Sequence, residues 1–148
     1  MYMLSDTVTI DGDVASIWDT MTDAANWATW DPHFLSCGFE GPFEVGGTGW
    51  TVNRIVSGKA SHFTLLKVDK ERGFTTRSPI PFGQMLIINK YEPEGEGRVR
   101  VTRTSEVYGP FALIFRYFRK QYRHDVQLTF AALEQEAARR AAQARSAG

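Results

Sequence analysis

The residues best suited to chemistry, or to binding an aromatic molecule, are concentrated between residues 23 and 34, in the stretch DAANWATWDPHF. An imidazole can change charge near neutral pH, so His33 could transfer protons if a substrate lay beside it. Trp27, Trp30 and Phe34 could form the rim of a cavity, with Trp30 facing a ligand. They could equally pack this segment onto a core, and His33 could simply be solvated. Both interpretations stay open at this point.

A second group of polar side chains could act inside a cavity. It consists of Arg54, Arg77, Asn89, Tyr91, Arg103, Glu106, Tyr108, Tyr122 and Asp125. Cyclisation or dehydration of a poly-carbonyl chain needs a group that moves protons and a donor that stabilises an enolate oxygen. Strand alternation places Asn89 and Tyr91 on one face. A buried Asp125 would need a cationic partner, for which Arg103 or Arg54 is available, and a purely structural ion pair is an equally good interpretation.

The sequence lacks the motifs of metal, phosphate and nucleophile sites. Its three histidines do not have the spacing of metal ligands, and Cys37 is the only thiol. The glycine-rich stretch GPFEVGGTGW lacks the lysine and the following Ser or Thr of a P-loop, so it is better explained as a turn or bulge. No Gly-x-Ser-x-Gly elbow occurs. We therefore expect no metal and no cofactor, and the sequence assigns no catalytic residue.

Composition narrows the range of partners. The formal net charge is zero at pH 7, so we expect no binding to nucleic acid. No apolar run approaches the roughly 20 residues of a membrane-spanning helix, and the first residues do not resemble a signal peptide. We therefore expect no stable membrane insertion, and the single cysteine favours a cytoplasmic location. The basic residues Arg116, Arg119, Lys120 and Arg123 fit a solvated helix face, with anionic lipid as the alternative partner.

Periodicity predicts the elements that must position these residues. Residues 4–10 alternate as a half-buried strand, and apolar residues at 14, 17, 18 and 21 predict a short helix with Asp11 or Gly12 as its cap. Residues 24–31 can form a second short helix, which Pro32 would end. Further strands are predicted at 35–40, 48–56, 60–68, 72–78, 84–92 and 98–108, with turn-forming residues between them.

A long amphipathic helix follows, opened by Pro110 and spanning 111–133. We expect one domain over residues 1–134, and a helical tail at 135–148 that frays because it has no apolar stripe. Strand, two helices, six strands and a helix predict an α+β fold, with a curved antiparallel sheet wrapped around the last helix. A straight helix need not touch a curved sheet along its whole length, which leaves room for a cavity.

Four stretches, in this order, are typical of one known family: VTIDGDVASIWDTMTD, NWATWDP, EGPFEVGGTG and RTSEVYGPFALIF. Together they resemble the START-like, or SRPBCC, helix-grip superfamily and, within it, proteins of the polyketide cyclase/dehydrase type. The resemblance runs from about Ser5 to Glu134. It implies a seven-stranded antiparallel sheet that grips the C-terminal helix around an apolar cavity. The superfamily includes cyclases, lipid carriers and hormone receptors, so the fold alone selects no reaction.

The leading hypothesis is therefore that the protein binds a small apolar or aromatic molecule, lipid-like or polyketide-like, between the sheet and the last helix. One alternative is a polyketide cyclase or aromatase that uses Tyr, Arg and His or Asp in the pocket. Another is a lipid or quinone carrier, or a module that binds a protein partner. The expected oligomeric state is a monomer or weak homodimer. The residues expected to contact the ligand are Trp30, His33, Trp50, Phe82, Asn89, Tyr91, Arg103, Phe118 and Tyr122.

Overall fold

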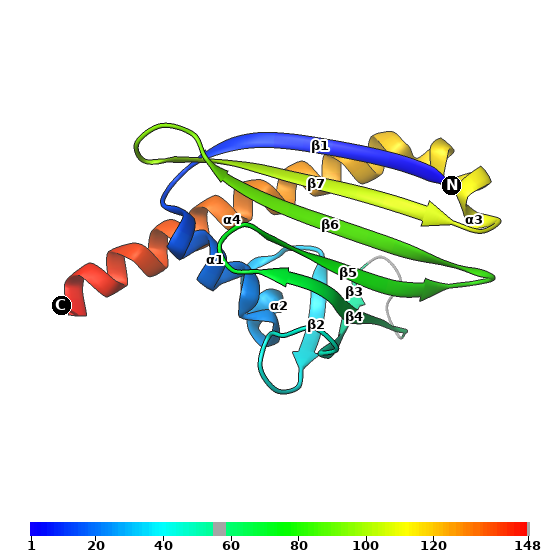
Figure 1. The fold of residues 1–148 in the computed structure, drawn as a ribbon, viewed down its shortest axis with the longest axis horizontal. Coiled ribbons are helices and arrows are strands. Elements are labelled where there is room, and N and C mark those ends of the chain that lie inside the picture. The colour runs from blue at the N-terminus through cyan, green and yellow to red at the C-terminus, as the bar shows by residue number, and fades with distance from the viewer. Residues whose placement is uncertain (55–58, 148) are drawn as a thin grey trace.

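The strands form one antiparallel sheet that follows the predicted order (Figure 1). The computed structural model of the protein describes residues 1–54 and 59–147. In space the strand order is β1-β7-β6-β5-β4-β3-β2. The strands are β1 (Tyr2–Asp11), β2 (Phe34–Phe39), β3 (Thr48–Asn53), β4 (Ala60–Asp69), β5 (Gly73–Ile80), β6 (Gly83–Pro93) and β7 (Arg98–Tyr108). Residues 55 and 56, the end of the strand expected at 48–56, lie outside the described residues.

The helices differ from the prediction mainly in where they break. They are α1 (Val14–Thr22), the 3₁₀ turn η1 (Ala24–Asn26), α2 (Trp27–Trp30), α3 (Phe111–Phe115), the 3₁₀ turn η2 (Arg116–Phe118) and α4 (Arg119–Ala147). The helix expected from residue 111 is thus interrupted by η2, and α4 continues beyond the sheet (Figure 1). The domain boundary and the fraying expected at 135–148 stay predictions. Among the described residues no helix is both long and apolar enough to cross a membrane.

Helix α1 begins one or two residues later than the sequence suggested. Asp13, not Asp11 or Gly12, is its N-cap, and one Asp13 carboxylate oxygen accepts a hydrogen bond of 2.8 Å from the backbone N–H of Ser16. Gly12 instead has φ of 143°, a conformation that L side chains rarely adopt, so it makes the turn between β1 and α1. This hydrogen bond and the β-region backbone of Asp13 are the usual geometry of a cap.

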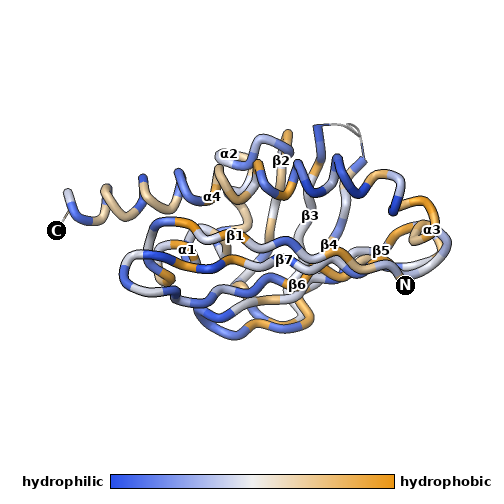
Figure 2. Tube along the Cα trace, turned by 90° about the horizontal axis from the view of Figure 1, so that it is seen from above, coloured by the Kyte–Doolittle hydropathy of each residue, from blue (hydrophilic) through white to orange (hydrophobic). Residues whose placement is uncertain are grey.

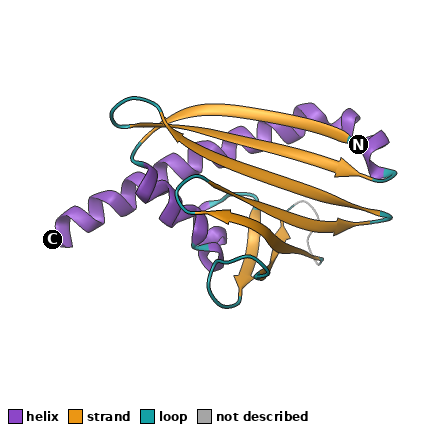
Figure 3. Cartoon of the chain, in the orientation of Figure 1, coloured by secondary structure: helices purple, strands orange, loops and turns teal. Residues whose placement is uncertain are grey.

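The sheet curves around α4, as the helix-grip prediction requires. Figure 3 shows α4 crossing behind the long strands β1, β7 and β6, and the perpendicular view in Figure 2 shows β2 and β3 rising to the level of the helix. Register shifts between Phe34 and Ser36 in β2, and between Leu65 and Lys67 in β4, mark irregularities where strands bend. The predicted helix-grip fold is confirmed.

One large core joins the sheet, α1 and the middle of α4. Trp18 of α1 makes edge-on ring contacts with Phe74 at 6.2 Å and with Tyr91 at 6.1 Å. Phe130 and Leu133 of α4 are almost fully buried in the same cluster. A smaller cluster around Leu4, Val107 and Phe115 packs α3 against the other end of β1 and β7. The space of functional interest lies between these two clusters.

Candidate functional site

A cavity of about 210 Å³ lies between the sheet and α4. Its walls are Met21, Trp27, Trp30, Asp31, Phe34, Thr51, Ser61, Phe63, Phe74, Thr76, Ser78, Ile80, Met85, Ile87, Asn89, Arg103 and Thr129. The sheet presents small side chains here toward its β2 edge: Thr51 and Ser61 face each other across β3 and β4. These side chains are too short to reach α4, so the curved sheet and the helix enclose unfilled space.

A second, more open hollow of about 620 Å³ adjoins the first. It shares Thr51, Ser61 and Met85 with the inner cavity and is bounded on the helix side by residues of α3, η2 and the first turns of α4. Tyr122 and Asp125 belong to this outer hollow only. The two spaces therefore share part of one wall, and the outer hollow lies on the side toward α3.

The segment of residues 23–34, here called the tryptophan-rich connection, forms one wall of the cavity. Its two indoles have different roles. Trp27 stacks on Phe63 with a centroid distance of 5.3 Å, and its indole N–H donates a 2.9 Å hydrogen bond to the backbone carbonyl of Met21. Trp30 also lines the cavity, but its buried indole nitrogen has no hydrogen-bond partner among the described residues. Trp27 therefore anchors the wall, whereas Trp30 presents a free donor.

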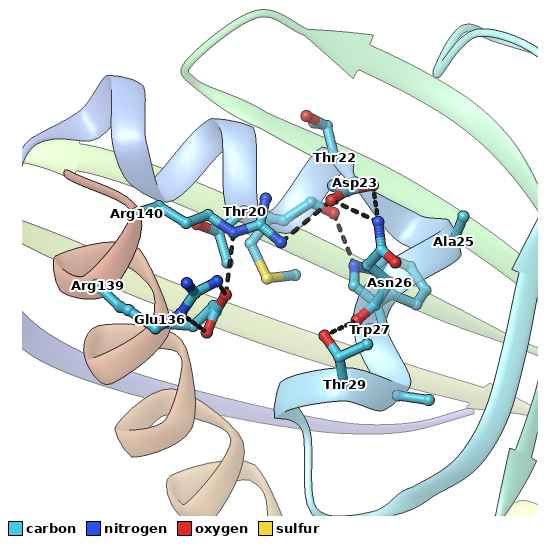
Figure 4. Close-up of polar contacts among 12 residues, drawn as sticks. Thr20, Thr22, Asp23, Ala25, Asn26, Trp27, Thr29, Glu136, Arg139 and Arg140 are labelled. Carbon is cyan, nitrogen blue, oxygen red and sulfur yellow. Dashed lines mark hydrogen bonds and ion pairs between the residues drawn. The ribbon is translucent and has the colours of Figure 1, made fainter. Parts of the chain in front are cut away.

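The connection is fastened on its other side by the C-terminal half of α4 (Figure 4). Arg140 approaches Asp23 at 3.1 Å, and Asp23 also accepts hydrogen bonds from the side-chain amide of Asn26. Glu136 holds Arg140 in place with a 3.2 Å contact. Hydrogen bonds, first from Arg139 and then from Arg140, lower the pKa of Glu136 against the opposing effect of burial. This network keeps the wall in one position above the cavity.

A polar bridge built on His33 links the wall to α4. Asp31 accepts 2.9 Å hydrogen bonds from the backbone N–H of His33 and pairs with the ring Nδ1 at the same distance. The Thr129 hydroxyl donates to the other Asp31 oxygen at 3.2 Å, and Asp125 lies 3.5 Å from His33 Nε2. Asp31 is only 5% exposed and lines the inner cavity. One histidine ring thus lies between a carboxylate that lines the inner cavity and one that lines the outer hollow, but His33 itself, which was expected to contact the ligand, borders neither space.

The structure corrects the partners expected for Asp125. Neither Arg103 nor Arg54 binds it; its contacts are the Gln121 amide, at 2.9 Å, and His33. Arg54 instead donates from Nε to the backbone carbonyl of Pro32 at 2.7 Å, because its strand ends beside the tryptophan-rich connection.

Arg103 and Asn89 form a second polar pair, on the sheet wall. They are directly opposite each other in β7 and β6, and Arg103 Nε donates a 3.0 Å hydrogen bond to Asn89 Oδ1. The guanidinium lies 5.8 Å from the ring centroid of Phe130. Both residues line the inner cavity, as the sequence-based list expected. A cation and an amide therefore face a cavity whose other walls are apolar side chains, hydroxyl side chains and Asp31.

The two predicted tyrosines lie apart. Tyr91 shares the inward face with Asn89, but its ring lies in the core against Trp18 and outside the cavity lining. Its hydroxyl is buried with no partner among the described residues, and burial strongly raises its pKa. Tyr122 lines the outer hollow and shares a hydrogen bond with Ser105. Burial raises the pKa of Tyr122 as well, with Arg103 opposing the shift.

Three predicted aromatic contacts do not reach the inner cavity. Trp50 alternates with Thr51 and so lies on the outer face of β3, where its indole covers Gly38 of the neighbouring strand. Phe82 lies in the turn between β5 and β6 with φ of 59° and a side chain that is 92% exposed. Phe118 borders only the outer hollow and is 54% exposed, since η2 turns it away from the sheet.

The sequence-based list also omitted residues that the fold brings to the site. Asp31 and Thr129 were not candidates, nor were the small residues Thr76 and Ser78 of β5. Thr129 could have been found, because it occupies the apolar stripe of the last helix. Thr76 and Ser78 alternate with exposed Arg77, which could have placed them on the inward face.

The comparison with known proteins agrees with this geometry. The family model described as "Polyketide cyclase / dehydrase and lipid transport" matches residues 1–138. The chain belongs to this family. No curated protein matches its sequence. The polyketide cyclase/dehydrase family therefore provides the fold and the general setting of the cavity, while the ligand must be inferred from the residues of this chain.

Solved structures share the fold at low sequence identity. The di-domain ARO/CYC StfQ of the steffimycin biosynthetic pathway is 15% identical with a TM-score of 0.76; the match covers 95% of this chain and 51% of that one, so this chain spans about half of StfQ. Protein NE0264 from Nitrosomonas europaea is 16% identical over 94% and 96% of the two chains, with a TM-score of 0.75. A START superfamily protein from Mycobacterium smegmatis is 13% identical over 94% and 99%, with a TM-score of 0.74.

Proposed function

We propose that the protein binds a small apolar or aromatic molecule in the inner cavity. The observation that supports this most directly is an unfilled space whose walls combine aromatic and aliphatic side chains, such as Trp30, Phe34 and Ile87, with hydroxyl side chains and a small set of stronger polar groups. Binding sites for small molecules have this composition, because apolar walls supply affinity and a few polar groups fix the orientation. The outer hollow supplies an entrance. Membership of a family described by cyclisation, dehydration and lipid transport is consistent with such a ligand.

Native mass spectrometry of the purified protein, before and after denaturation, tests this proposal. We expect a small molecule that remains bound under native conditions and is released on unfolding. Ser78→Phe should abolish its retention, because Ser78 faces the cavity and the larger side chain would occupy it. Arg77→Phe is the matched control, since Arg77 lies on the same strand and is exposed. Equal retention by both variants would place the ligand elsewhere.

A second candidate function is a cyclase-type enzyme, and the His33 bridge favours it. Asp31 pairs with Nδ1 of the ring, and Nε2 faces Asp125, a residue that lines the outer hollow. A histidine oriented in this way can act as a general base, while Arg103 could stabilise an enolate oxygen. The simplest test is proton exchange at the methyl group of 2-acetylnaphthalene. An enzyme should accelerate it and His33→Gln should remove the acceleration, whereas a simple binding protein should show none.

A carrier is the third candidate, favoured by an exposed apolar end. Leu113, Ile114 and Tyr117 of α3 and η2 are largely exposed, beside the entrance and beside basic residues such as Arg119. Such a surface suits docking on an anionic bilayer, where apolar side chains enter the interface. A carrier should co-sediment with vesicles containing phosphatidylglycerol but not with pure phosphatidylcholine. Leu113→Asp should prevent it, and lack of any vesicle binding would exclude this variant of the function.

The location and the oligomeric state are separate parts of the proposal. We expect a cytoplasmic protein that is a monomer or weak homodimer. Light scattering after size-exclusion chromatography, over a range of concentrations, gives the mass directly. A stable higher oligomer would contradict this expectation.

A further inference from the structure

The inner cavity contains hydrogen-bond donors, from Trp30 and Arg103, for which the described residues provide no acceptor. We propose that the natural ligand is an aromatic or polycyclic acid whose carboxylate is bound by Arg103. This inference rests on the proposed binding function and specifies the class of ligand. It follows from three groups: the Arg103 guanidinium, the Asn89 amide and the Trp30 indole N–H.

Arg103 has N–H groups that are not used in hydrogen bonds to the described residues. Its Nε is used by Asn89 Oδ1, and no described residue accepts a hydrogen bond from its two terminal nitrogens. A guanidinium presents its N–H groups as a planar fork that matches the two oxygens of a carboxylate. The hydrogen bond to Asn89, which is only 4% exposed, holds this fork in place. Asn89 then keeps its own amide N–H₂ as a further donor at the same wall.

The acidic groups nearby are committed to other partners. Asp31, which also lines the cavity, has one oxygen engaged by His33 and the other by the Thr129 hydroxyl. Asp6 lies opposite Arg103 in the β1–β7 register, but it pairs with Arg123 at 3.5 Å. Within the described residues no carboxylate lies within 4 Å of the Arg103 nitrogens. A cation without a counter-ion in a largely apolar space is costly, and a ligand carboxylate would offset that cost.

Trp30 supplies a donor from the opposite wall. Its indole nitrogen is buried and unpartnered, although buried indole N–H groups usually find an acceptor. The aromatic rings of Phe63 and Phe74 lie along the same cavity, and so would flank the body of a flat ligand. The ligand class that satisfies all of these groups has an aromatic body and oxygen acceptors, at least one of them anionic.

Isothermal titration calorimetry with 2-naphthoate and 2-naphthamide at pH 7 tests this inference. The two compounds have nearly the same shape, and only the first is charged. We expect the wild type to bind naphthoate at least tenfold more tightly than naphthamide. Arg103→Met should weaken naphthoate binding at least tenfold and change naphthamide binding less than threefold. Arg77→Met, on the exposed face of β5, is the matched control and should change neither.

Two further variants keep the test decisive if Arg103→Met does not fold. Arg103→Lys retains the charge but not the fork, and should reduce the preference for naphthoate without abolishing it. Trp30→Phe retains the ring but not the N–H, and should weaken naphthoate several-fold. Equal affinity of the wild type for the two compounds would overturn the role of Arg103 while leaving cavity binding intact. Failure of both compounds to bind would count against the proposed binding function itself.

Discussion

The two halves of the interface between α4 and the sheet are built differently, although the backbone is continuous across both. Where Phe130 and Leu133 of α4 face the sheet, they are almost fully buried in one cluster with large aromatic side chains such as Trp18. On the N-terminal side of Phe130, at Asp125 and Thr129, the helix faces hollows instead. The inward face of β5 shows the transition, since it passes from Phe74 through small polar residues within four positions. Side-chain size, more than a break in the fold, therefore determines where the cavity lies.

We call the region around Phe130 and Leu133 the filled half and the region around Asp125 and Thr129 the open half. The strongest test of the difference is truncation of a side chain in the filled half. Phe130→Ala should lower the free energy of unfolding by about 3–5 kcal/mol, because an almost fully buried ring leaves a void. Met85→Ala, in the wall shared by both hollows, should cost about 2 kcal/mol or less, because its side chain already borders open space. Urea unfolding followed by tryptophan fluorescence measures both. Equal losses would mean that the two halves are packed alike.

The open half depends on its polar bridge, and Asp31→Ala tests that dependence. The variant leaves the His33 backbone N–H without its acceptor and leaves the Thr129 hydroxyl with His33 Nδ1 alone, so we expect a loss of about 1–3 kcal/mol. Asp125→Ala is the comparison, since that carboxylate is more exposed and should contribute about 1 kcal/mol or less. Chemical denaturation at pH 7 measures each. If Asp125→Ala lowered the free energy of unfolding more than Asp31→Ala, the polar bridge would depend mainly on Asp125, contrary to this prediction.

Much of the fold could be predicted because its signals are local. Alternation and turn residues located all six strands after the first helices to within a few residues, as in β7, where both ends agree. The break at η2 could not be predicted in the same way. The apolar spacing through Phe111, Phe115 and Phe118 fits an uninterrupted helix, and only packing on β1 and β7 shows that the first turns form a separate unit.

The site was harder to predict because it depends on which residues are absent from the interior as well as on which are present. Sequence reasoning favoured large aromatic and charged side chains, and so included Trp50 and Phe82, which lie on the outer face and in a turn. The cavity instead exists because Ser61 and Ser78 are small. Asn89 and Arg103 were found correctly, but their pairing needs the β6–β7 register, which no local pattern reveals.

Helix α1 contributes Trp18 to the filled half, and its N-cap gives a smaller effect there. Asp13→Ala should cost about 1 kcal/mol. The hydrogen bond from the Ser16 backbone lowers the pKa of Asp13, so this contribution is present above the ordinary carboxyl pKa, near pH 4, and is lost as the pH falls through the lower folded value. Asp13→Asn should retain the cap without that acid dependence. Neither change should affect ligand binding in the open half, as calorimetry with 2-naphthoate can show.

The smallest expected effect concerns Tyr91, whose hydroxyl is buried in the filled half. Its buried hydroxyl has no partner among the described residues, so Tyr91→Phe should change the free energy of unfolding by less than about 1 kcal/mol at pH 7, in the stabilising direction. Because burial raises the Tyr91 pKa, the unfolded chain ionises first, and the wild type should lose stability as the pH rises above about 10. Tyr91→Phe should lose less stability, as unfolding curves at pH 8 and pH 10.5 can show.

Tyr122→Phe is the matched control from the open half: it removes a hydrogen bond to Ser105 and should cost about 1 kcal/mol at pH 7. If Tyr91→Phe lowered the free energy of unfolding more than Tyr122→Phe, the Tyr91 hydroxyl would have a hydrogen-bond partner in solution. The filled half would then contain a polar contact that the structure does not show there.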